Sequence, residues 1–399
     1  MRTRRQRKQS RGRIVALLTI TVVFVLLVGG WYWRGHRRSH WPSERQETSA
    51  QKASKKQAET KPKKAAPKQS RRSELKRPNN VDYQQQLEAK LNDNQFVGTG
   101  LMVKDGKVVA VYGRGYANAQ RGQVNGADTA FQINSMQKCL TEFLVMKQVQ
   151  AGKVKLSDHL SQYYPQVPGS TRITLAQMFT MTSGLSMNGM GSGPYNSDRD
   201  VVNNAIAHLQ FTPSAWGQAN YQPVNVVLLA GILEKVSGQT YQQLFEEQLI
   251  RPLQLQHTYF GYQIPAASLV ATGYYSAGNL PSYEQPLALS PLQQHYELGT
   301  GQVFMSAEDF YRAVSSILNG KLLPAALIAE QFKGNSRDQY GGGLYNTEPF
   351  KSANGVGIYF RSTIHITPNG QDGVVLMTNQ SVSLNLIAGM AKDLQQSLL

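Results

Sequence analysis

A serine and a lysine stand three residues apart in the stretch FQINSMQKCLTEF, at Ser135 and Lys138. A serine hydroxyl is a weak nucleophile until a neighbouring base takes its proton. A lysine amine can be that base where burial or another cation lowers its pKa. Taken alone, the same spacing also describes a serine that caps a helix and a lysine in solvent, so the pair needs structural context.

The segment after Ser135 has the pattern of a helix. Apolar residues stand at positions 136, 139, 140, 143, 144 and 146, and Gly152 provides a stop. Ser135 falls where strand-like residues give way to this helix, so its backbone N–H is free and the helix dipole favours negative charge. Lys138 follows one turn later on the same face. The sequence therefore predicts that the two side chains meet where a helix begins.

Strands are predicted at both ends of the region that follows residue 78. The stretch FVGTGLMVKDGKVVAVYGRGYAN indicates two strands joined at Asp105-Gly106, and three more strands are indicated near the C-terminus by YGGGLYN, VGIYFRSTIHITP and DGVVLMTNQ. Helices are predicted between them, in PVNVVLLAGILEKVSG, TYQQLFEEQLIRPL and SAEDFYRAVSSILNGK, and a last helix from about Leu384. This order predicts an α+β domain over residues 79–399, with one antiparallel sheet built from both termini and a helical region inserted between them.

Five ordered blocks resemble the penicillin-recognising serine hydrolases, in the branch of class C β-lactamases and D-alanyl-D-alanine carboxypeptidases. They are the opening hairpin, the helix with Ser135 and Lys138, ITLAQMFTMTSGL, YQPVNVVLLAGILEKVSG and FKSANGVGIYFRSTIHITPNGQDGVVLMTNQ. Together they cover about 300 residues from residue 95 to the C-terminus. The resemblance implies a β-lactamase-like fold, and the family's teichoic-acid D-alanyl esterases suggest a substrate class.

The resemblance also implies roles for particular residues. Ser135 is expected to be the nucleophile and Lys138 its base, and Tyr221, in the place of the family's tyrosine motif, is expected to move protons. Lys351-Ser352-Ala353 is similar to the family's K-T/S-G motif, so Lys351 and Ser352 are expected to bind substrate. The backbone N–H groups of Ser135 and Asn354 are expected to form the oxyanion hole.

Three residues depart from the family's pattern. Pro223 replaces an asparagine that holds the amide of the substrate's acyl side chain in relatives, Ala353 replaces a glycine, and Met181 replaces a frequent histidine. A D-alanyl ester carries a free amine instead of that amide, so the loss at position 223 favours a D-alanyl esterase on teichoic or lipoteichoic acid. A D-alanyl-D-alanine carboxypeptidase or β-lactamase-like enzyme is the first alternative. A wall-binding relative without catalysis is the second.

The charge of the chain is concentrated in its first 78 residues. That segment holds 22 of the 42 Lys and Arg and only four acids, so its net charge is +18. The whole chain has a net charge of +17, so residues 79–399 together are nearly neutral. A nucleic-acid-binding domain needs its basic patch on a folded face, so we expect no nucleic-acid partner.

The N-terminal segment predicts attachment to a membrane. Residues 14–33 are uncharged and twenty long, enough to span roughly 30 Å of bilayer. Residues 1–13 hold seven Lys and Arg, which favours a cytoplasmic N-terminus. Residues 34–78 have almost no large aliphatics, which predicts a basic disordered stalk. We therefore expect an uncleaved single-pass signal anchor in the cell membrane, with the domain of residues 79–399 outside the cell and in reach of D-alanylated wall polymer or peptidoglycan peptides.

Cysteine and histidine usage excludes two further classes. Cys139 is the only cysteine, so an intrachain disulfide and a cysteine-rich zinc site are impossible. The histidines of the domain show no metal-ligand spacing. We expect neither a metal nor a cofactor.

Overall fold

The computed structural model describes residues 82–189 and 191–399. The predicted segments 1–13, 14–33 and 34–78 lie outside the described residues. Within the part that is described, no helix combines the length and the apolar character that a membrane span requires.

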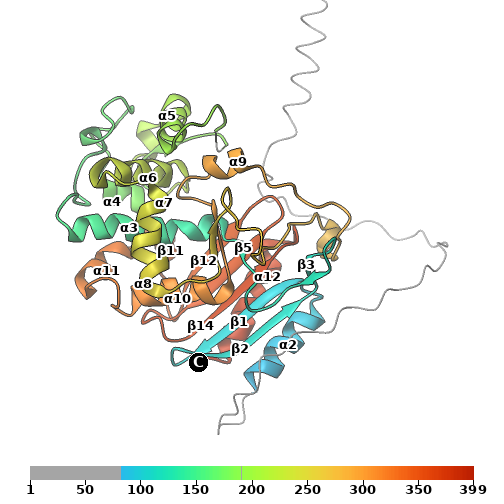
Figure 1. The fold of residues 1–399 in the computed structure, drawn as a ribbon. Helices are drawn as coiled ribbons and strands as arrows, with labels where there is room; N and C mark the ends of the chain where they lie inside the picture. Colours follow the sequence, from blue (N-terminus) through green and yellow to red (C-terminus); the bar gives the residue numbers. More distant parts are fainter. Residues whose placement is uncertain (1–81, 190) are drawn as a thin grey trace, which may run out of the picture. The chain divides into compact units, whose positions relative to one another are not determined.

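A seven-stranded antiparallel sheet forms the centre of the domain, in the order β10-β11-β12-β13-β14-β1-β2. Its strands are β1 (Gly98–Lys104), β2 (Lys107–Arg114), β10 (Tyr340–Gly341), β11 (Leu344–Tyr345), β12 (Lys351–Val356), β13 (Arg361–Ile366) and β14 (Gly373–Thr378). Strand β1 from the N-terminal part pairs with β14 from the C-terminal part, and the two lie side by side in Figure 1. The prediction of an α+β fold with one sheet built from both ends is confirmed.

Helices cover both faces of this sheet, so its central strands are buried on both sides. Helices α2 (Tyr83–Asp93) and α12 (Leu384–Gln396) cover one face, and α10 (Ala307–Leu318) lies on the other with α3 (Gln137–Gln150) behind it. Successive side chains of a strand point to opposite faces. Met102 accordingly belongs to the smaller core, with Leu87 and Ile387, whereas Leu101 belongs to the larger one, with Phe143.

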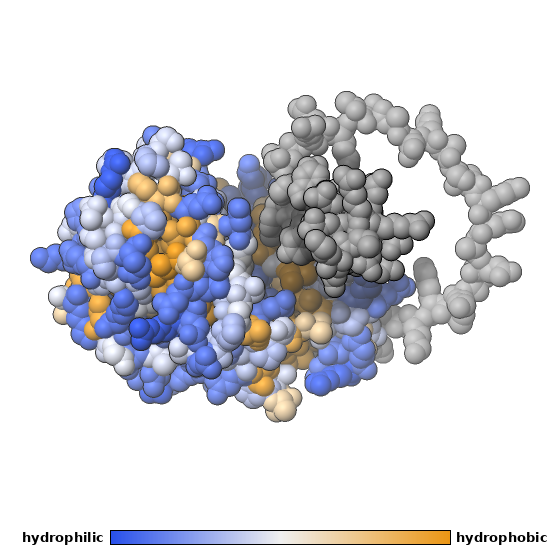
Figure 2. Space-filling view, turned by 90° about the horizontal axis from the view of Figure 1, so that it is seen from above, coloured by the Kyte–Doolittle hydropathy of each residue, from blue (hydrophilic) through white to orange (hydrophobic). Residues whose placement is uncertain are grey.

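The helical region lies between β5 (Phe131–Gln132) and β10 in the chain. Its other helices are α4 (Leu175–Phe179), α5 (Asp198–His208), α6 (Val224–Ser237), α7 (Tyr241–Phe245), α8 (Arg251–Leu253), α9 (Pro291–Tyr296) and α11 (Ala325–Gln331). Helix α6 is buried along most of its length because it packs against α3, α4, α5 and α7. Viewed from above, the surface of this region is largely hydrophilic and carries a hydrophobic patch (Figure 2).

Short strands pair away from the main sheet. They are β3 (Tyr116–Asn118) with β4 (Gln123–Val124), β6 (Leu185–Ser186) with β7 (Gln210–Phe211), and β9 (Val303–Met305) between β5 and β8 (Thr258–Phe260). Strand β5 leads directly into the segment of Ser135. Its pairing with β9 therefore anchors the approach to that segment.

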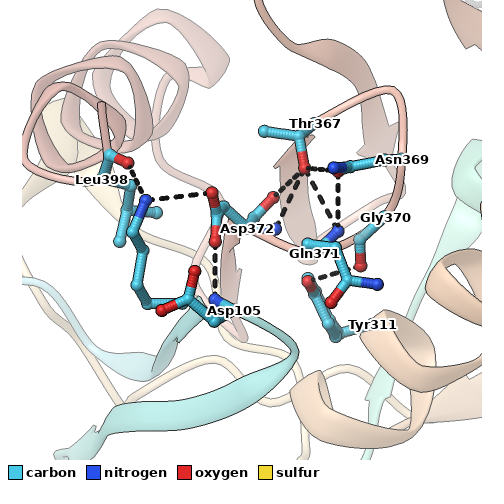
Figure 3. A network of polar contacts seen from close by, with 9 residues as sticks. Asp105, Tyr311, Thr367, Asn369, Gly370, Gln371, Asp372 and Leu398 are labelled. Carbon is cyan, nitrogen blue, oxygen red and sulfur yellow. Dashed lines mark hydrogen bonds and ion pairs between the residues drawn. The ribbon is translucent and has the colours of Figure 1, made fainter.

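A polar network joins the turns at one end of the sheet to the last helix (Figure 3). Asp372 forms an ion pair with Lys104 at 3.0 Å and accepts a hydrogen bond from the Asp105 N–H at 2.7 Å. The Lys104 amine also donates to the Leu398 carbonyl at 2.6 Å. On the other side of the β13–β14 turn, the Tyr311 hydroxyl donates to the Gly370 carbonyl at 3.0 Å. The β1–β2 turn, the β13–β14 turn, α10 and the C-terminus are thereby held together.

Most predicted helices and turns have the predicted positions. Strands β1 and β2 meet at the turn Asp105-Gly106. Helix α6 ends at Ser237, and Gly238, which follows it, has the left-handed backbone conformation. Ser306 caps α10 by accepting a hydrogen bond from the Asp309 N–H. The stretch TYQQLFEEQLIRPL is not one regular helix. It forms α7, a π-helical turn over residues Glu246–Ile250 and the short α8, where Pro252 cannot donate the backbone hydrogen bond of a regular helix.

Candidate active site

Ser135 and Lys138 are in direct contact. Ser135 lies in the 3₁₀ turn Asn134–Met136 that precedes α3, and the Lys138 amine donates to the Ser135 hydroxyl oxygen at 2.8 Å. The Lys138 side chain is only 1% exposed, whereas Ser135 is half-buried. A serine hydroxyl in hydrogen-bond contact with an amine can pass its proton to that amine. The arrangement can activate a serine hydroxyl.

Tyr221 lies close to the amine of this lysine. The Lys138 amine is 5.2 Å from the centroid of the Tyr221 ring. This ring also meets the ring of Tyr340 edge to face, at 5.4 Å between centroids. Tyr221 is 41% exposed, so its ring borders the solvent-facing mouth of the site. The structure therefore brings together the three residues that the sequence nominated for catalysis: Ser135, Lys138 and Tyr221.

The loop that carries Tyr221 is fixed by buried polar contacts. The Asn220 N–H donates to the Met181 carbonyl at 2.8 Å. Asn225, at the start of α6, is fully buried; its amide donates to the Gln222 carbonyl at 3.0 Å and its oxygen accepts from the Ser183 hydroxyl at 2.6 Å. Asn225 was not predicted from the sequence. The signal for it is an asparagine within the otherwise apolar start of a buried helix.

Pro223 and Met181 both fit this arrangement. Pro223 stands directly before α6 with helical backbone angles, which suits a proline at a helix start. Met181 is buried and has a positive φ of 55°, which costs energy for a residue with a Cβ. The Asn225 amide lies 3.5 Å from the Met181 sulfur. Pro223 and Met181, two of the residues that depart from the family's pattern, thus both lie next to the segment that carries Tyr221.

Lys351 is held at the start of β12 by a hydrogen bond and a ring contact. Its amine donates to the Asn346 side-chain oxygen at 2.8 Å and lies 5.4 Å from the centroid of the Phe332 ring. Burial lowers the pKa of this amine, and the nearby Glu348 carboxylate opposes that shift. Ser352 pairs with Tyr345 of β11, and the buried side-chain oxygen of Asn354 has no hydrogen-bond partner among the described residues.

Strand β12 passes close to the residue before the nucleophile turn at Gly355. A Cβ built on Gly355 would lie 2.2 Å from the Ile133 carbonyl oxygen and equally close to the Ser362 hydroxyl, so no side chain fits there. Gly357 is similarly tight against the Asn134 side chain. A glycine is needed where one backbone approaches another closely. The resemblance to the family places a glycine at position 353, where this chain has the buried Ala353.

Two carboxyl groups lie near Lys138, the buried Glu142 and the half-buried Glu297, and neither was predicted from the sequence. Glu142 follows one helical turn later in α3, is 0% exposed, and neither carboxylate oxygen has a hydrogen-bond partner among the described residues. Burial raises its pKa well above the usual range, and Lys138 opposes the shift. Glu297 accepts a hydrogen bond from Gln132 at 2.8 Å. Burial raises the pKa of Glu297 to about 7, again against the effect of Lys138. An acid four residues after a lysine, and therefore on the same face of the helix, is the signal for Glu142.

The remaining candidate groups lie apart from this chemistry. The Cys139 thiol is buried, and desolvation raises its pKa, so it stays protonated and unreactive. His295 is stacked between Tyr195 and Tyr262, with centroid distances of 3.7 and 3.8 Å. Over the described ranges, no three His, Cys, Asp or Glu side chains gather in a way that could hold a metal ion.

The fold and the site define a β-lactamase-like α+β architecture with a serine at the start of its central helix. A family model described as beta-lactamase matches residues 84–394. The chain belongs to the beta-lactamase family.

Two curated relatives span much of the chain. PbpX of Bacillus subtilis (strain 168) is 28% identical over 379 residues, which cover 94% of this chain and 92% of PbpX. The teichoic acid D-alanine hydrolase of Staphylococcus aureus is 28% identical over 299 residues and 72% of each chain.

Solved structures share the fold. The crystal structure of FmtA from Staphylococcus aureus covers 83% of this chain and 91% of its own, with a TM-score of 0.71 and 24% identity. The D-amino acid amidase of Ochrobactrum anthropi SV3 covers 79% of this chain and 99% of its own, with a TM-score of 0.66 and 17% identity. At these identities the likeness concerns the fold alone.

Proposed function

We propose that the protein is a serine hydrolase that acts through an acyl-enzyme on D-alanyl groups of the cell wall. The observation that carries this proposal is the hydrogen bond of 2.8 Å between the Ser135 hydroxyl and the buried Lys138 amine. A nucleophile within hydrogen-bond reach of a base is the signature of covalent catalysis. Family membership supports hydrolysis as the reaction class.

The reaction would proceed in two halves. Lys138 takes the proton of Ser135 as the hydroxyl oxygen attacks the D-alanyl carbonyl, and the backbone N–H of Ser135 stabilises the oxyanion together with an N–H of β12. Asn354 is the expected second donor. Tyr221 passes the proton from Lys138 to the leaving oxygen, so that the alcohol departs and the alanyl ester of Ser135 remains. Water then attacks this ester and gives a proton to Lys138, which returns it to the Ser135 oxygen as D-alanine is released.

The substrate we favour is a D-alanyl ester of teichoic or lipoteichoic acid. A relative that is 28% identical over 72% of the chain bears the name teichoic acid D-alanine hydrolase. Pro223 agrees with this choice, because its ring offers no amide to hold an acylated substrate nitrogen, and a D-alanyl ester has none. An alcohol is also a better leaving group than an amine, so an altered site can still turn over an ester.

Two alternatives make different predictions. A D-alanyl-D-alanine carboxypeptidase or β-lactamase-like enzyme would use the same residues and prefer a peptide or lactam. The fold that the chain shares with the penicillin-binding protein of Bacillus halodurans is consistent with this alternative. A wall-binding relative without catalysis would have no need of a buried lysine on the serine. The contact of Ser135 with Lys138 therefore favours an enzyme.

We further propose that residues 14–33 anchor the chain in the cell membrane and that residues 34–78 form a basic stalk, with the hydrolase domain outside the cell. Support comes from the sequence: twenty uncharged residues follow seven Lys and Arg. A cationic stalk beside an anionic wall polymer would raise the local concentration of substrate.

Measuring D-alanine release from purified teichoic acid and from a D-alanyl-D-alanine pentapeptide, side by side, tests the substrate. The Ser135→Ala variant is the control for release without the enzyme. We expect faster, Ser135-dependent release from teichoic acid. Faster release from the pentapeptide would replace the esterase with the carboxypeptidase.

A further inference from the structure

A pocket of about 490 Å³ lies against the loops that precede Tyr221 and Tyr340. Its walls come from α4 and the residues after it, from the loop of residues 217–219 and from residues 333–337. Lys333 and Arg337 are the charged residues that line it, and no acid lines it. The other lining residues are mostly amides, hydroxyls and glycines. The pocket therefore offers hydrogen-bond donors and positive charge to a ligand.

The basic wall of the pocket is held in place by hydrogen bonds. Arg337 donates from one guanidinium nitrogen to the Ala219 carbonyl at 3.0 Å, which ties the two loops together. The Asn335 side chain donates to the Thr180 carbonyl at 3.1 Å and accepts from the Arg337 N–H at 2.9 Å. One contact leaves the guanidinium with further N–H donors. The Lys333 amine is exposed and has no hydrogen-bond or ion-pair partner within the described part of the chain.

Both loops of the pocket lead to the tyrosine pair of the active site. Ala219 is two residues before Tyr221, and Arg337 is three residues before Tyr340. The rings of Tyr221 and Tyr340 meet at 5.4 Å, so the two loops converge there. The nearest acid in sequence, Asp338, is outside the lining and accepts a hydrogen bond from the Tyr340 N–H at 3.2 Å. A ligand bound in the pocket would lie next to a substrate group that reaches past Tyr221.

We propose that this pocket binds a phosphate group of a phosphodiester chain that carries the D-alanyl ester. The inference rests on the proposed function and specifies which part of the polymer, besides the D-alanyl ester, the protein binds. Guanidinium and amine donors bind phosphate oxygens through charge-assisted hydrogen bonds. A phosphodiester is anionic, so an acidic side chain in the lining would repel it, and this lining has none. The neighbouring unit of the same chain would then present its ester to Ser135.

Two double variants test the proposal in the full-length protein. Lys333→Gln with Arg337→Gln removes the charges of the pocket, and Lys107→Gln with Lys392→Gln removes two exposed charges elsewhere. D-Alanine release is measured on teichoic acid and on D-alanine methyl ester, which has no phosphate. We expect the pocket variant to raise the KM for teichoic acid about tenfold, which corresponds to the loss of one such contact. Its kcat and its rate on the methyl ester should stay within about twofold, and the control variant should match wild type.

A binding measurement separates this proposal from the proposed function. Calorimetry with a glycerol phosphate oligomer free of D-alanine detects the pocket without catalysis, and the basic N-terminal segment is the same in all variants. We expect the pocket variant alone to bind about tenfold more weakly. Equal affinity of both variants, or an unchanged KM for teichoic acid, would overturn the phosphate site while leaving the esterase intact. If wild type releases no D-alanine from teichoic acid, the proposed function fails and the oligomer measurement alone decides the pocket.

Discussion

The Lys138 amine reaches the Ser135 hydroxyl at 2.8 Å from a position that is 1% exposed. The helix start supplies the geometry, because both residues lie within one turn of the beginning of α3. The Tyr221 ring lies close to the same amine, at 5.2 Å between the amine and the ring centroid. The lysine can therefore exchange a proton with the serine and has little access to bulk water.

Lys138→Ala should lose most of its turnover and keep its fold. Removing a positioned base costs roughly 10²–10⁴-fold in rate. The fold should persist because Glu142 and Glu297, which have raised pKa values, can stay protonated without the cation. Steady-state kinetics and circular dichroism measure the two effects. Lys147→Ala is the matched control, since Lys147 lies on the same helix and hydrogen-bonds the exposed Gln150. A Lys138→Ala enzyme within a few-fold of wild type would exclude Lys138 as the base.

Gly355→Ala should impair catalysis far more than Ala353→Gly. The added methyl group would meet the Ile133 carbonyl at 2.2 Å and push β12 away from the nucleophile turn. A displacement of about 1 Å at a reacting group can cost about a hundredfold in rate. Gly389→Ala, which meets no atom within 4 Å, is the control. Steady-state kinetics compare the variants, and thermal unfolding verifies that each variant is folded. A larger effect from Ala353→Gly than from Gly355→Ala would mean that position 353, and not position 355, controls the placement of β12 at the active site.

Glu297→Gln should change how stability depends on pH. The folded-state pKa of about 7 lies above the ordinary value of 4.5, so the folded protein keeps this proton longer than the unfolded chain. The wild-type free energy of unfolding should therefore fall as pH rises from about 4.5 to 7, by up to about 3 kcal/mol from this group. The glutamine side chain of the variant does not titrate, so the variant should lack that part of the slope. Urea unfolding of both proteins across this range measures the difference. Parallel curves would mean that Glu297 is ionised in the folded protein as it is in the unfolded one.

Protease added to intact cells should release the domain and leave a short membrane-bound stub. The reason is the predicted span of residues 14–33 behind a basic N-terminus. Immunoblots with antibodies against each end of the chain follow the two fragments. A cytosolic protein serves as the control for cell integrity. Full protection of the domain in intact cells would reverse the proposed orientation.

The sequence predicts the elements that have strong local signals. The hairpin at Asp105-Gly106 and the buried helix α6 follow from turn chemistry and periodicity, which act within a few residues. Ser135 and Lys138 could be nominated because a single helical turn joins them. Tyr221, 86 positions after Ser135, could be nominated only by resemblance to a family.

What the sequence does not predict depends on long-range packing. Glu297 approaches Lys138 from a different part of the chain, and its raised pKa follows from burial that no local pattern reveals. The close approach at Gly355 depends on how β12 passes the nucleophile turn, which no local sequence pattern reveals. Pairing of β12 with β13 fixes this register.

The most direct test of the account is to trap the acyl-enzyme. Full-length protein is mixed with teichoic acid, quenched in acid during turnover, digested and analysed by mass spectrometry. We predict that the peptide containing Ser135 gains the mass of one alanyl group at that serine, and that the adduct is absent from Ser135→Ala. D-Alanine release without any adduct on Ser135, or with the adduct on another residue, would contradict the central claim.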